Sequence, residues 1–188
     1  MTRRVIVGIS GASGIAYGVR TLELLREVDD VESHLVMTAA AKITLAEETD
    51  HHVADVEALA DHVHGAKNIG AAIASGSFRT VGMVVAPCSI KSLSAIANSY
   101  SADLLARAAD VTLKERRPLV LLVRETPLHL GHLRLCTQVT EMGGVIFPPV
   151  PAMYASPASI DDLVTHSVVR SLEHLNIDAA QITRWHGG

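Results

Sequence analysis

The loop Gly11–Gly14 (GASG) is the first stretch whose residue types and spacing could do chemistry. It follows the apolar run Val5–Ser10 and precedes a segment with apolar residues at helical spacing. At such a strand–loop–helix junction, small residues let backbone N–H groups and a helix N-terminus face an anion such as a phosphate. A tight strand-to-helix turn that binds nothing is an equally good interpretation.

The end of the next predicted strand decides which phosphate compound fits this loop better. A dinucleotide such as NAD requires an acidic residue there to hold the ribose hydroxyls. The sequence has Thr38 at that position, and its first carboxylate afterwards is Glu47. A mononucleotide such as FMN therefore fits better than NAD.

The segment Pro87–Ser92 (PCSIKS) carries two hydroxyls at the start of a predicted helix. Ser89 and Ser92, with the backbone N–H groups beside them, could contact a second phosphate or the edge of a ring. Ser89 could equally cap the helix, and both roles can hold together. Cys88 could be a nucleophile, but no histidine stands at a recognisable motif spacing. A small buried apolar residue is the better interpretation of Cys88.

The segment Arg124–Pro127 (RETP) places a cation and a carboxylate at the end of another strand. The planar guanidinium of Arg124 could hold a phosphate. Glu125 could move a proton in a dry pocket, where desolvation would raise its pKa. A surface ion pair is the alternative, and these residues alone slightly favour it. The acidic run at 47–50 is similarly typical of a solvated helix end.

Two histidine pairs, His51 with His52 and His62 with His64, raise the question of a metal site. Their spacing is not diagnostic, and no carboxylate pattern accompanies them in the sequence. Both pairs lie in polar surroundings. We therefore expect no metal ligand among the candidate residues.

The elements that must position these residues are strands alternating with helices. The predicted strands are Val5–Ser10, Ser33–Thr38, Val81–Ala86, Pro118–Val123 and Val145–Phe147. The predicted helices are Ala16–Val28, Ala39–Glu48, Val53–His64, Lys91–Asn98, Ala102–Glu115, Leu130–Met142 and Ser159–Leu175. This alternation predicts an α/β fold with a doubly wound parallel sheet, whose ligands bind beyond the carboxyl ends of the strands. Ser159 and Asp162 form a predicted capping box, and the least predictable segment is 65–80.

The composition indicates one domain over residues 1–188, with a C-terminal tail from about residue 176. The 188 residues, 48% of them hydrophobic, are enough for a single core. The net charge of -4 is spread along the chain, which argues against a nucleic-acid partner. The apolar runs are shorter than the roughly twenty residues that a membrane span needs, and no signal peptide is evident. Two cysteines without a CxxC motif argue against a disulfide framework or a structural zinc site, and we expect a cytoplasmic protein.

Six segments resemble those of the UbiX-type flavin prenyltransferases. They are GISGASG (Gly8–Gly14), AEETD (Ala46–Asp50), ASGSF (Ala74–Phe78), VAPCSIKSLSAIA (Val85–Ala97), RAADVTLKERRPLVLLVRETPL (Arg107–Leu128) and PPVPAMYASPASIDDLV (Pro148–Val164). The resemblance covers roughly Val5–Trp185, and the third, fifth and sixth segments in this order are highly specific. The segments SGSFRT and CSIK further resemble the branch whose members accompany aromatic- or phenolic-acid decarboxylases and often carry the decarboxylase's name.

The resemblance implies a three-layer Rossmann- or flavodoxin-like protomer that assembles into a homododecamer. It also implies a metal-free reaction in which reduced FMN is alkylated by dimethylallyl monophosphate. The isoprenyl unit joins flavin N5, and a ring closure onto C6 adds a fourth ring. The product, prenylated FMN, is then the cofactor of a separate UbiD-type decarboxylase.

The same resemblance implies roles for individual residues. The FMN-binding residues would be Gly11, Ala12, Ser13, Thr38, Ser89, Ile90, Lys91, Ser92 and Arg124. The isoprenyl phosphate would meet Arg107, Lys114, Glu125, Tyr154 and Arg170, with Trp185 covering the site. Glu125, Ser13 and Glu48 would be catalytic. Thr38 stands where the family often has Ser, and Lys91 replaces a common Gly, so a Lys91 contact would run through the backbone.

We further expect the pocket to form where subunits meet, with Glu48 and the helix carrying Arg107 and Lys114 out of reach of their own protomer's flavin. Alternatives are a flavin-dependent cysteine decarboxylase, a direct aromatic-acid decarboxylase and a non-catalytic flavin carrier. The cysteine decarboxylases require a Lys directly after the Tyr of the first helix and an Asn in a Pro-x-Met-Asn motif. This chain has Gly18 and Tyr154 at those positions, which counts against that class.

Overall fold

Six strands form one parallel sheet within residues 2–185 and 187, which are the residues that the computed structural model describes. The strands are β1 (Arg3–Ile9), β2 (Val31–Met37), β3 (His62–Gly65), β4 (Gly82–Cys88), β5 (Leu119–Val123) and β6 (Val145–Ile146). Their spatial order is β3-β2-β1-β4-β5-β6. The central strands are apolar runs because helices cover both of their faces, and all seven residues of β4 are buried.

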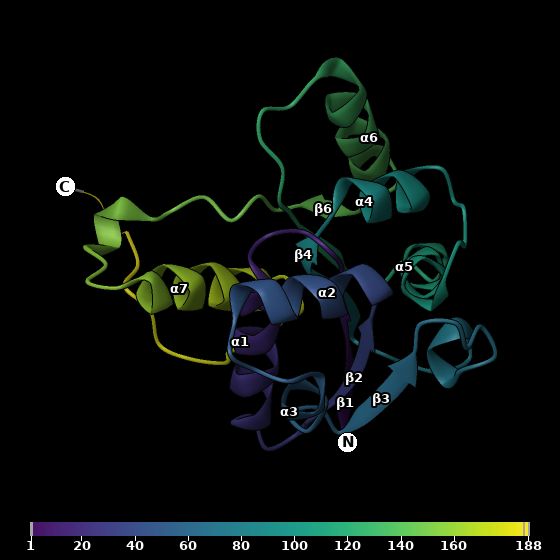
Figure 1. Cartoon of the computed structure of the whole chain (residues 1–188), viewed down its shortest axis with the longest axis horizontal. Coiled ribbons are helices and arrows are strands. Elements are labelled where there is room, and N and C mark those ends of the chain that lie inside the picture. The colour runs from purple at the N-terminus through teal and green to yellow at the C-terminus, as the bar shows by residue number, and fades with distance from the viewer. Residues whose placement is uncertain (1, 186, 188) are drawn as a thin grey trace.

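Helices cover the two faces of the sheet and make a three-layer molecule (Figure 1). They are α1 (Ile15–Arg26), α2 (Ala39–Glu48), α3 (Val53–Glu57), α4 (Ile90–Ala97), α5 (Leu104–Lys114), α6 (Leu130–Glu141) and α7 (Ile160–Glu173), with 3-10 turns η1 (Ala72–Ala74) and η2 (Met153–Ala155). The apolar residues of α1, α2 and α7 pack on one face of the sheet. Those of α4, α5 and α6 pack on the other face, so the molecule has two hydrophobic cores.

The strand order reverses at β1, because β2 pairs with one side of β1 and β4 with the other. In a doubly wound sheet this point opens a crevice between the loops that follow the two adjacent strands, here β1 and β4. Here those loops are 10–14 and 88–89, and both lie at the carboxyl edge of the sheet. The predicted α/β class is confirmed, and its candidate residues follow the strands as expected.

The predicted helix Val53–His64 is wrong in its second half. The helix α3 ends at Glu57, and the following residues pair with β2 as the edge strand β3, with His34 opposite His62. A hydrogen bond from the Ser33 backbone N–H to the Asp61 carboxylate (2.7 Å) fixes the start of this pairing. Pairing with β2 therefore overrides the helical pattern of this segment. The least predictable segment, 65–80, contains the 3-10 turn η1 and lies along α5.

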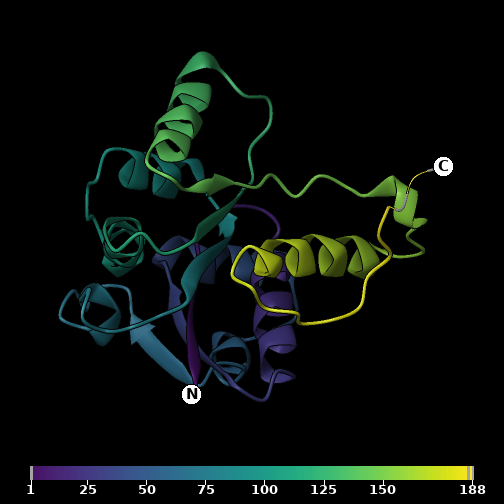
Figure 2. The same cartoon turned by 180° about the vertical axis from the view of Figure 1, so that it is seen from behind.

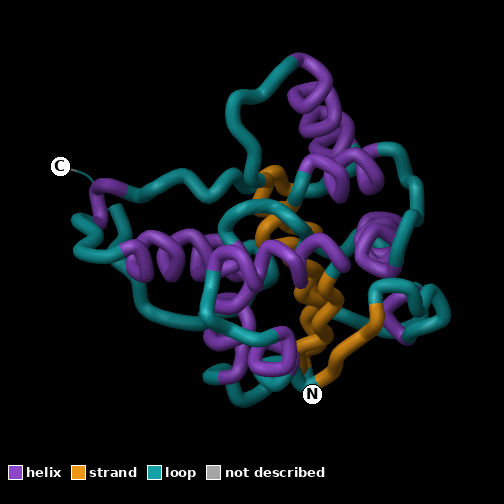
Figure 3. Tube along the Cα trace, viewed as in Figure 1, coloured by secondary structure: helices purple, strands orange, loops and turns teal. Residues whose placement is uncertain are grey.

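Two parts extend away from the sheet. Helix α6 projects beyond it and buries only Val139 among its own residues (Figure 2). Residues 147–152 run as an extended loop to η2, after which α7 returns toward the sheet (Figure 3). The capping box of Ser159 and Asp162 at the start of α7 is confirmed. Among the described residues, no helix is both long and apolar enough to cross a membrane.

Candidate active site at the carboxyl edge of the sheet

Ser10 joins the two loops that meet at the carboxyl edge of the sheet. Its hydroxyl is fully buried, donates to the carbonyl of Pro87 (2.9 Å) and accepts from the backbone N–H of Ser89 (2.7 Å). Because this buried hydroxyl both donates and accepts a hydrogen bond, it fixes the spacing between β1 and the start of α4. The sequence motifs did not single out Ser10, although a polar residue that ends the run VIVGIS is a usable signal.

Gly11 is required by the close approach of the first loop to α2. A Cβ atom at Gly11 would lie 2.4 Å from the Cβ of Ala40 and 2.8 Å from its carbonyl carbon. Any side chain there would push the loop away from α2. The small residues of the GASG loop therefore place its backbone against the N-terminus of α2.

The N-terminus of α1 is closed by Glu48, from the end of α2. Oε2 of Glu48 accepts hydrogen bonds from the backbone N–H groups of Gly14 (2.8 Å) and Ile15 (3.0 Å). The anion that faces this helix N-terminus is thus a side chain of the same molecule. One expectation is corrected: Glu48 is not a merely solvated helix end, because it binds the first loop of its own protomer.

The Glu48 carboxyl has a pKa below its ordinary value. Partial burial alone would raise this pKa, but hydrogen bonds from the Ser13 hydroxyl and from the Ile15 and Gly14 backbone, together with the charge of Arg124, lower it by more. Glu48 is therefore held as a carboxylate beside Ser13. This places two of the predicted catalytic residues in contact.

The N-terminus of α4 keeps free donors at the same edge. Ser89 is the N-cap and accepts from the Ser92 backbone N–H (3.3 Å), as the capping interpretation predicts. Within the described residues, the backbone N–H groups of Ile90 and Lys91 have no hydrogen-bond partner. Thr38 similarly caps α2 through a hydrogen bond from the Ala41 N–H (3.1 Å). These two helix starts present unused donors and hydroxyls to an anion.

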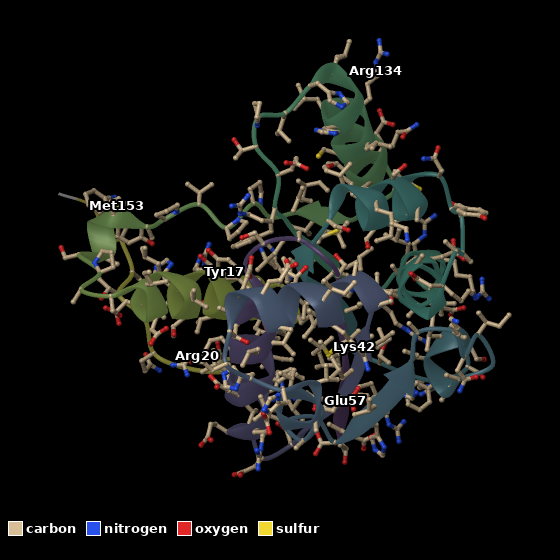
Figure 4. All side chains as sticks on the ribbon, viewed as in Figure 1. Tyr17, Arg20, Lys42, Glu57, Arg134 and Met153 are labelled. Carbon is tan, nitrogen blue, oxygen red and sulfur yellow. The ribbon has the colours of Figure 1, made fainter. Side chains whose placement is uncertain are left out.

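Tyr17 lies in the first turn of α1 (Figure 4), within range of the charge of Arg124. Burial raises the pKa of the Tyr17 hydroxyl, and the charge of Arg124 acts in the opposite direction. Tyr17 is half-buried and was not among the predicted site residues; it falls just beyond the segment Gly8–Gly14. The sequence offers a signal for it, since an aromatic in the first turn of a helix faces the same edge as the loop before it.

Glu125 is exposed in the single chain, and its Oε1 accepts from the backbone N–H of Thr126 (2.9 Å). The dry surroundings expected for this carboxylate are therefore not supplied by one protomer. Arg124 is also exposed, and its backbone N–H binds the carbonyl of Cys88 (3.1 Å). The strand end thus presents both side chains outward.

Cys88 is fully buried at the end of β4, as the apolar interpretation predicts. Burial raises the pKa of its thiol far above the ordinary value. A thiol in this state is a poor nucleophile.

Arg107 and Lys114 lie on α5, away from the first loop. The Nε atom of Arg107 donates to the carbonyl of Ala74 (3.3 Å), and its Nη1 pairs with Asp110 (2.9 Å). Lys114 pairs with Glu115. The hydrogen bond to Ala74 binds α5 to the segment 65–80, which lies along the helix.

Tyr154, Arg170 and Trp185 gather around the outer part of α7. The Tyr154 hydroxyl lies 3.2 Å from Nε2 of His166, and the Tyr154 ring meets the Trp185 ring edge-on at 6.0 Å. Arg170 pairs with Glu173. Tyr154 and Trp185 are both exposed.

The predicted substrate-binding residues therefore lie on opposite faces of the sheet. Helix α5, with Arg107 and Lys114, packs in one core, and α7, with Arg170, packs in the other. One chain brings together the first loop, Glu48, the starts of α2 and α4, and Arg124. It does not bring Arg107 and Arg170 together.

Comparisons with known proteins agree with this arrangement. The family model described as Flavoprotein matches residues 1–172. The flavin prenyltransferase UbiX of Escherichia coli K12 is 59% identical over 187 residues, covering 98% of this chain and 99% of the relative. UbiX of Thauera aromatica is 55% identical over 184 residues, covering 98% of this chain and 94% of the relative.

Solved structures are equally similar. A structure of AnUbiX in complex with FMN and dimethylallyl pyrophosphate has a TM-score of 0.97 and 48% identity, with complete coverage of both chains. A dodecameric FMN-dependent UbiX-like decarboxylase from Escherichia coli O157:H7 has a TM-score of 0.95 and 46% identity, covering 98% of this chain and all of the other. The cysteine decarboxylase SpaF, at 18% identity and a TM-score of 0.65, shares the fold alone. This chain belongs to the flavoprotein family and, within it, to the UbiX-type flavin prenyltransferases.

Proposed function

We propose that the carboxyl edge of the sheet binds reduced FMN and transfers a dimethylallyl group to it from dimethylallyl monophosphate. The observation that carries the proposal is the junction built by Ser10, where the free N–H groups at the start of α4 lie at the same edge as Arg124 and the loop held by Glu48. Similarity to a structure containing FMN and dimethylallyl pyrophosphate supports FMN and a dimethylallyl phosphate ester as the ligands here. The whole chain, 1–188, acts as one flavoprotein domain with a tail from about residue 176.

The phosphate of FMN fits the starts of α2 and α4 better than the glycine loop. The N-terminal donors of α1 are already used by Glu48, whereas Ile90 and Lys91 offer backbone N–H groups. The hydroxyls of Thr38 and Ser92 and the guanidinium of Arg124 add further donors. Gly11, Ala12 and Ser13 then contact the ring system, with Ser13 near N5, while Ser89 shapes the turn.

Reduced FMN supplies the nucleophilic N5 and C6 atoms to which the five-carbon unit becomes bonded. Arg107, Lys114 and Arg170 hold the phosphate of the second substrate, and Tyr154 adds a hydroxyl donor. Their charges stabilise the phosphate as the allylic C–O bond breaks, because the oxygen takes the electron pair of that bond. A monophosphate carries less charge than a diphosphate, so these residues suffice without a metal ion. Trp185 covers the pocket and keeps water out.

When the second bond forms, one carbon of the five-carbon unit's double bond is bonded to C6, the other carbon takes up a proton, and Glu125 relays the proton that leaves C6. Its exposed position at the end of β5 lets the carboxylate reach a ring bound at this edge. Glu48 holds Ser13 and the first loop in place as a carboxylate. A well-placed acid or base of this kind contributes about 10²–10⁴ in rate.

The complete pocket requires more than one copy of the chain. Arg107 and Arg170 lie on opposite faces of one sheet, so a single protomer cannot aim both at one phosphate. Large apolar side chains are exposed on α6 and on the segment leading to α7, as expected for interfaces between copies. They include Leu130, Leu133, Val150, Met153 and Ile160. A homododecamer, as in the related Escherichia coli structure, buries these residues and surrounds Glu125 with protein.

The product serves a separate UbiD-type decarboxylase, and the cytoplasm is the compartment in which both would act. A true decarboxylase subunit or a flavin carrier is the alternative. A direct decarboxylase would release carbon dioxide from an aromatic acid without a partner.

The experiment is anaerobic incubation with reduced FMN and dimethylallyl monophosphate, followed by mass analysis of the released flavin. The expected result is a flavin enlarged by one five-carbon unit. The variant Glu125→Gln is expected to keep FMN but to lose about 10²-fold or more of the product rate. Unmodified flavin from the unaltered chain, or an unchanged rate in Glu125→Gln, would contradict the proposal. A parallel incubation with the diphosphate tests which ester is preferred.

A further inference from the structure

A cluster of histidines and a glutamate lies between β2 and the edge strand β3. Glu32 and His34 come from β2, and His62 and His64 come from β3, with His34 directly opposite His62 in the strand register. From the sequence alone, His62 and His64 are not expected to bind a metal, because their spacing is not diagnostic and no metal-binding carboxylate pattern accompanies them. The fold supplies a carboxylate from the neighbouring strand.

The ligand atoms of this cluster converge on one point. Oε1 of Glu32 lies 2.9 Å from Nε2 of His34 and 3.3 Å from Nε2 of His62, and all three atoms lie within 4.8 Å of one another. A tetrahedral zinc ion with bonds of about 2.0–2.1 Å needs neighbouring ligand atoms about 3.3–3.4 Å apart. The 3.3 Å separation between Glu32 Oε1 and His62 Nε2 matches this spacing, and small side-chain movements bring the other ligand atoms to it, so the cluster suits one small cation held by two imidazoles and a carboxylate.

His34 is held in place before any ion binds. Its ring is 4% exposed, and its second nitrogen, Nδ1, lies 3.0 Å from Nε2 of His64. The edge of Phe78 packs against the same ring at 5.0 Å. A hydrogen bond donated by the ring N–H that does not face the ion fixes both the tautomer and the ring plane of a ligating histidine, so Nδ1–H of His34 donates to Nε2 of His64 when the ion is bound.

His62 gives the cluster an opening to solvent. Its side chain is 53% exposed, and its ring stacks on His34 with an interplanar angle of 16°. Because the His62 ring is exposed, it can turn its Nε2 lone pair toward an ion held by Glu32 and His34 without disturbing the core. Three protein ligands leave the fourth position of a tetrahedral ion to water.

The neighbouring charges favour a cation of high affinity for imidazole. The Arg4 Nε donates to Glu32 Oε1 (3.2 Å), and the Arg4 guanidinium also lies over the Phe78 ring at 4.8 Å. A bound ion must displace Arg4 from that oxygen, which a hard ion such as Mg²⁺ with one carboxylate does not achieve. Asp61 is held by Ser33 and adds negative charge without being a ligand.

We propose that Glu32, His34 and His62 form a Zn²⁺ site with an open fourth position, supported by His64. The site lies on the edge pair β2–β3 and is separate from the flavin-binding edge. Its effect is to clamp the edge strand β3, only four residues long, to the body of the sheet. Two imidazoles and a carboxylate with one open position is the ligand set of many zinc sites.

The test uses metal-free full-length protein, titrated with Zn²⁺ by calorimetry and with Co²⁺ by visible absorption. The unaltered chain is expected to bind one Zn²⁺ per copy and to give the intense Co²⁺ bands of tetrahedral coordination. The exposed ligand is removed in His62→Gln, which should fold normally because it empties no core. This variant is expected to bind Zn²⁺ at least about 10-fold more weakly and to lose the Co²⁺ bands.

Two further variants distinguish Zn²⁺ binding at this site from non-specific Zn²⁺ binding by other histidines. His64→Gln is expected to weaken Zn²⁺ binding about 10–100-fold, since it removes the hydrogen bond that orients His34. The control, His51→Gln with His52→Gln, removes the other histidine pair and is expected to leave the affinity unchanged. Equal Zn²⁺ affinity in His62→Gln and the unaltered chain would overturn the proposal, as would an equal loss in the control.

Discussion

The carboxylate of Glu48 lies 3.0 Å from the backbone nitrogen of Ile15 and closes the N-terminus of α1. The last turn of α2 thereby supplies the anion that the glycine loop before α1 could otherwise take from a ligand. This contact is the reason that we place the phosphate of FMN at the starts of α2 and α4 rather than at the glycine loop. It also makes the position of the loop depend on one ionised side chain.

Glu48→Gln is expected to lower the free energy of unfolding by less than about 1 kcal/mol at pH 7, because the contact is solvent-exposed. The pKa of the Glu48 carboxyl is lower in the folded chain than in the unfolded chain. Its contribution is therefore complete above the unfolded value of about 4.3 and is lost as the pH falls through the lower folded value. Urea unfolding at pH 7 and pH 3 measures this, and the difference between the two proteins should shrink at pH 3. A difference that grows on acidification would refute the assignment.

Ser10→Ala is expected to destabilise the chain by about 1–3 kcal/mol, because it leaves the Ser89 N–H without its buried acceptor. The start of α4 should also loosen, so FMN should dissociate more readily. Urea unfolding and flavin fluorescence report the two effects. Ser94→Ala, on the same helix but without such a bridge, is the matched control and should change neither quantity by much.

Cys88→Ala is expected to retain the prenylation rate, because a fully buried thiol with a raised pKa does not act as a nucleophile. Loss of the packed sulfur should cost about 1–2 kcal/mol of stability. Iodoacetamide at pH 8 should label Cys88 only after the chain is unfolded. Abolished turnover in a folded Cys88→Ala protein would restore the nucleophile interpretation.

Much of the fold is predictable from the sequence because each central strand is a short apolar run with a turn and a helical pattern after it. The helix Ala39–Glu48 has the predicted bounds, and Ser89 and Ser159 cap the helices that follow them. These features depend on residues that are close in the sequence, so tertiary contacts leave them as the sequence predicts. The strand β3 is different, because its four residues are polar in part and become a strand only by pairing with β2.

The residues at the carboxyl edge of the sheet were predictable from the sequence, but the hydrogen bonds that join distant segments there were not. The strand-end residues Thr38, Ser89 and Arg124 follow from the pattern, since parallel strands bring their carboxyl ends to one edge. The bond from Glu48 to the first loop spans 33 residues and depends on the angle at which α2 leaves the sheet. No periodicity encodes that angle. The same holds for the cluster of Glu32 and His34 with the histidines of β3.

The central claim is that one pocket takes residues from different copies of the chain. Assemblies that contain two different variants test this claim directly. Arg107→Ala and Arg170→Ala should each be nearly inactive, because each removes a charge that we propose holds the substrate phosphate. When equal amounts of the two variants assemble together, about one site in four should receive both arginines from different copies and regain activity. If both arginines came from one chain, the mixture would stay inactive.

A matched control mixes unaltered chains with chains carrying both substitutions. Shared pockets predict about one quarter of the unaltered activity, whereas pockets within single chains predict about one half. Size measurements on each preparation confirm that all variants assemble alike. The measurement is the prenylated-flavin rate of the Arg107→Ala and Arg170→Ala mixture: the account predicts recovery to about one quarter of the unaltered rate. A rate no higher than that of either variant alone would contradict it.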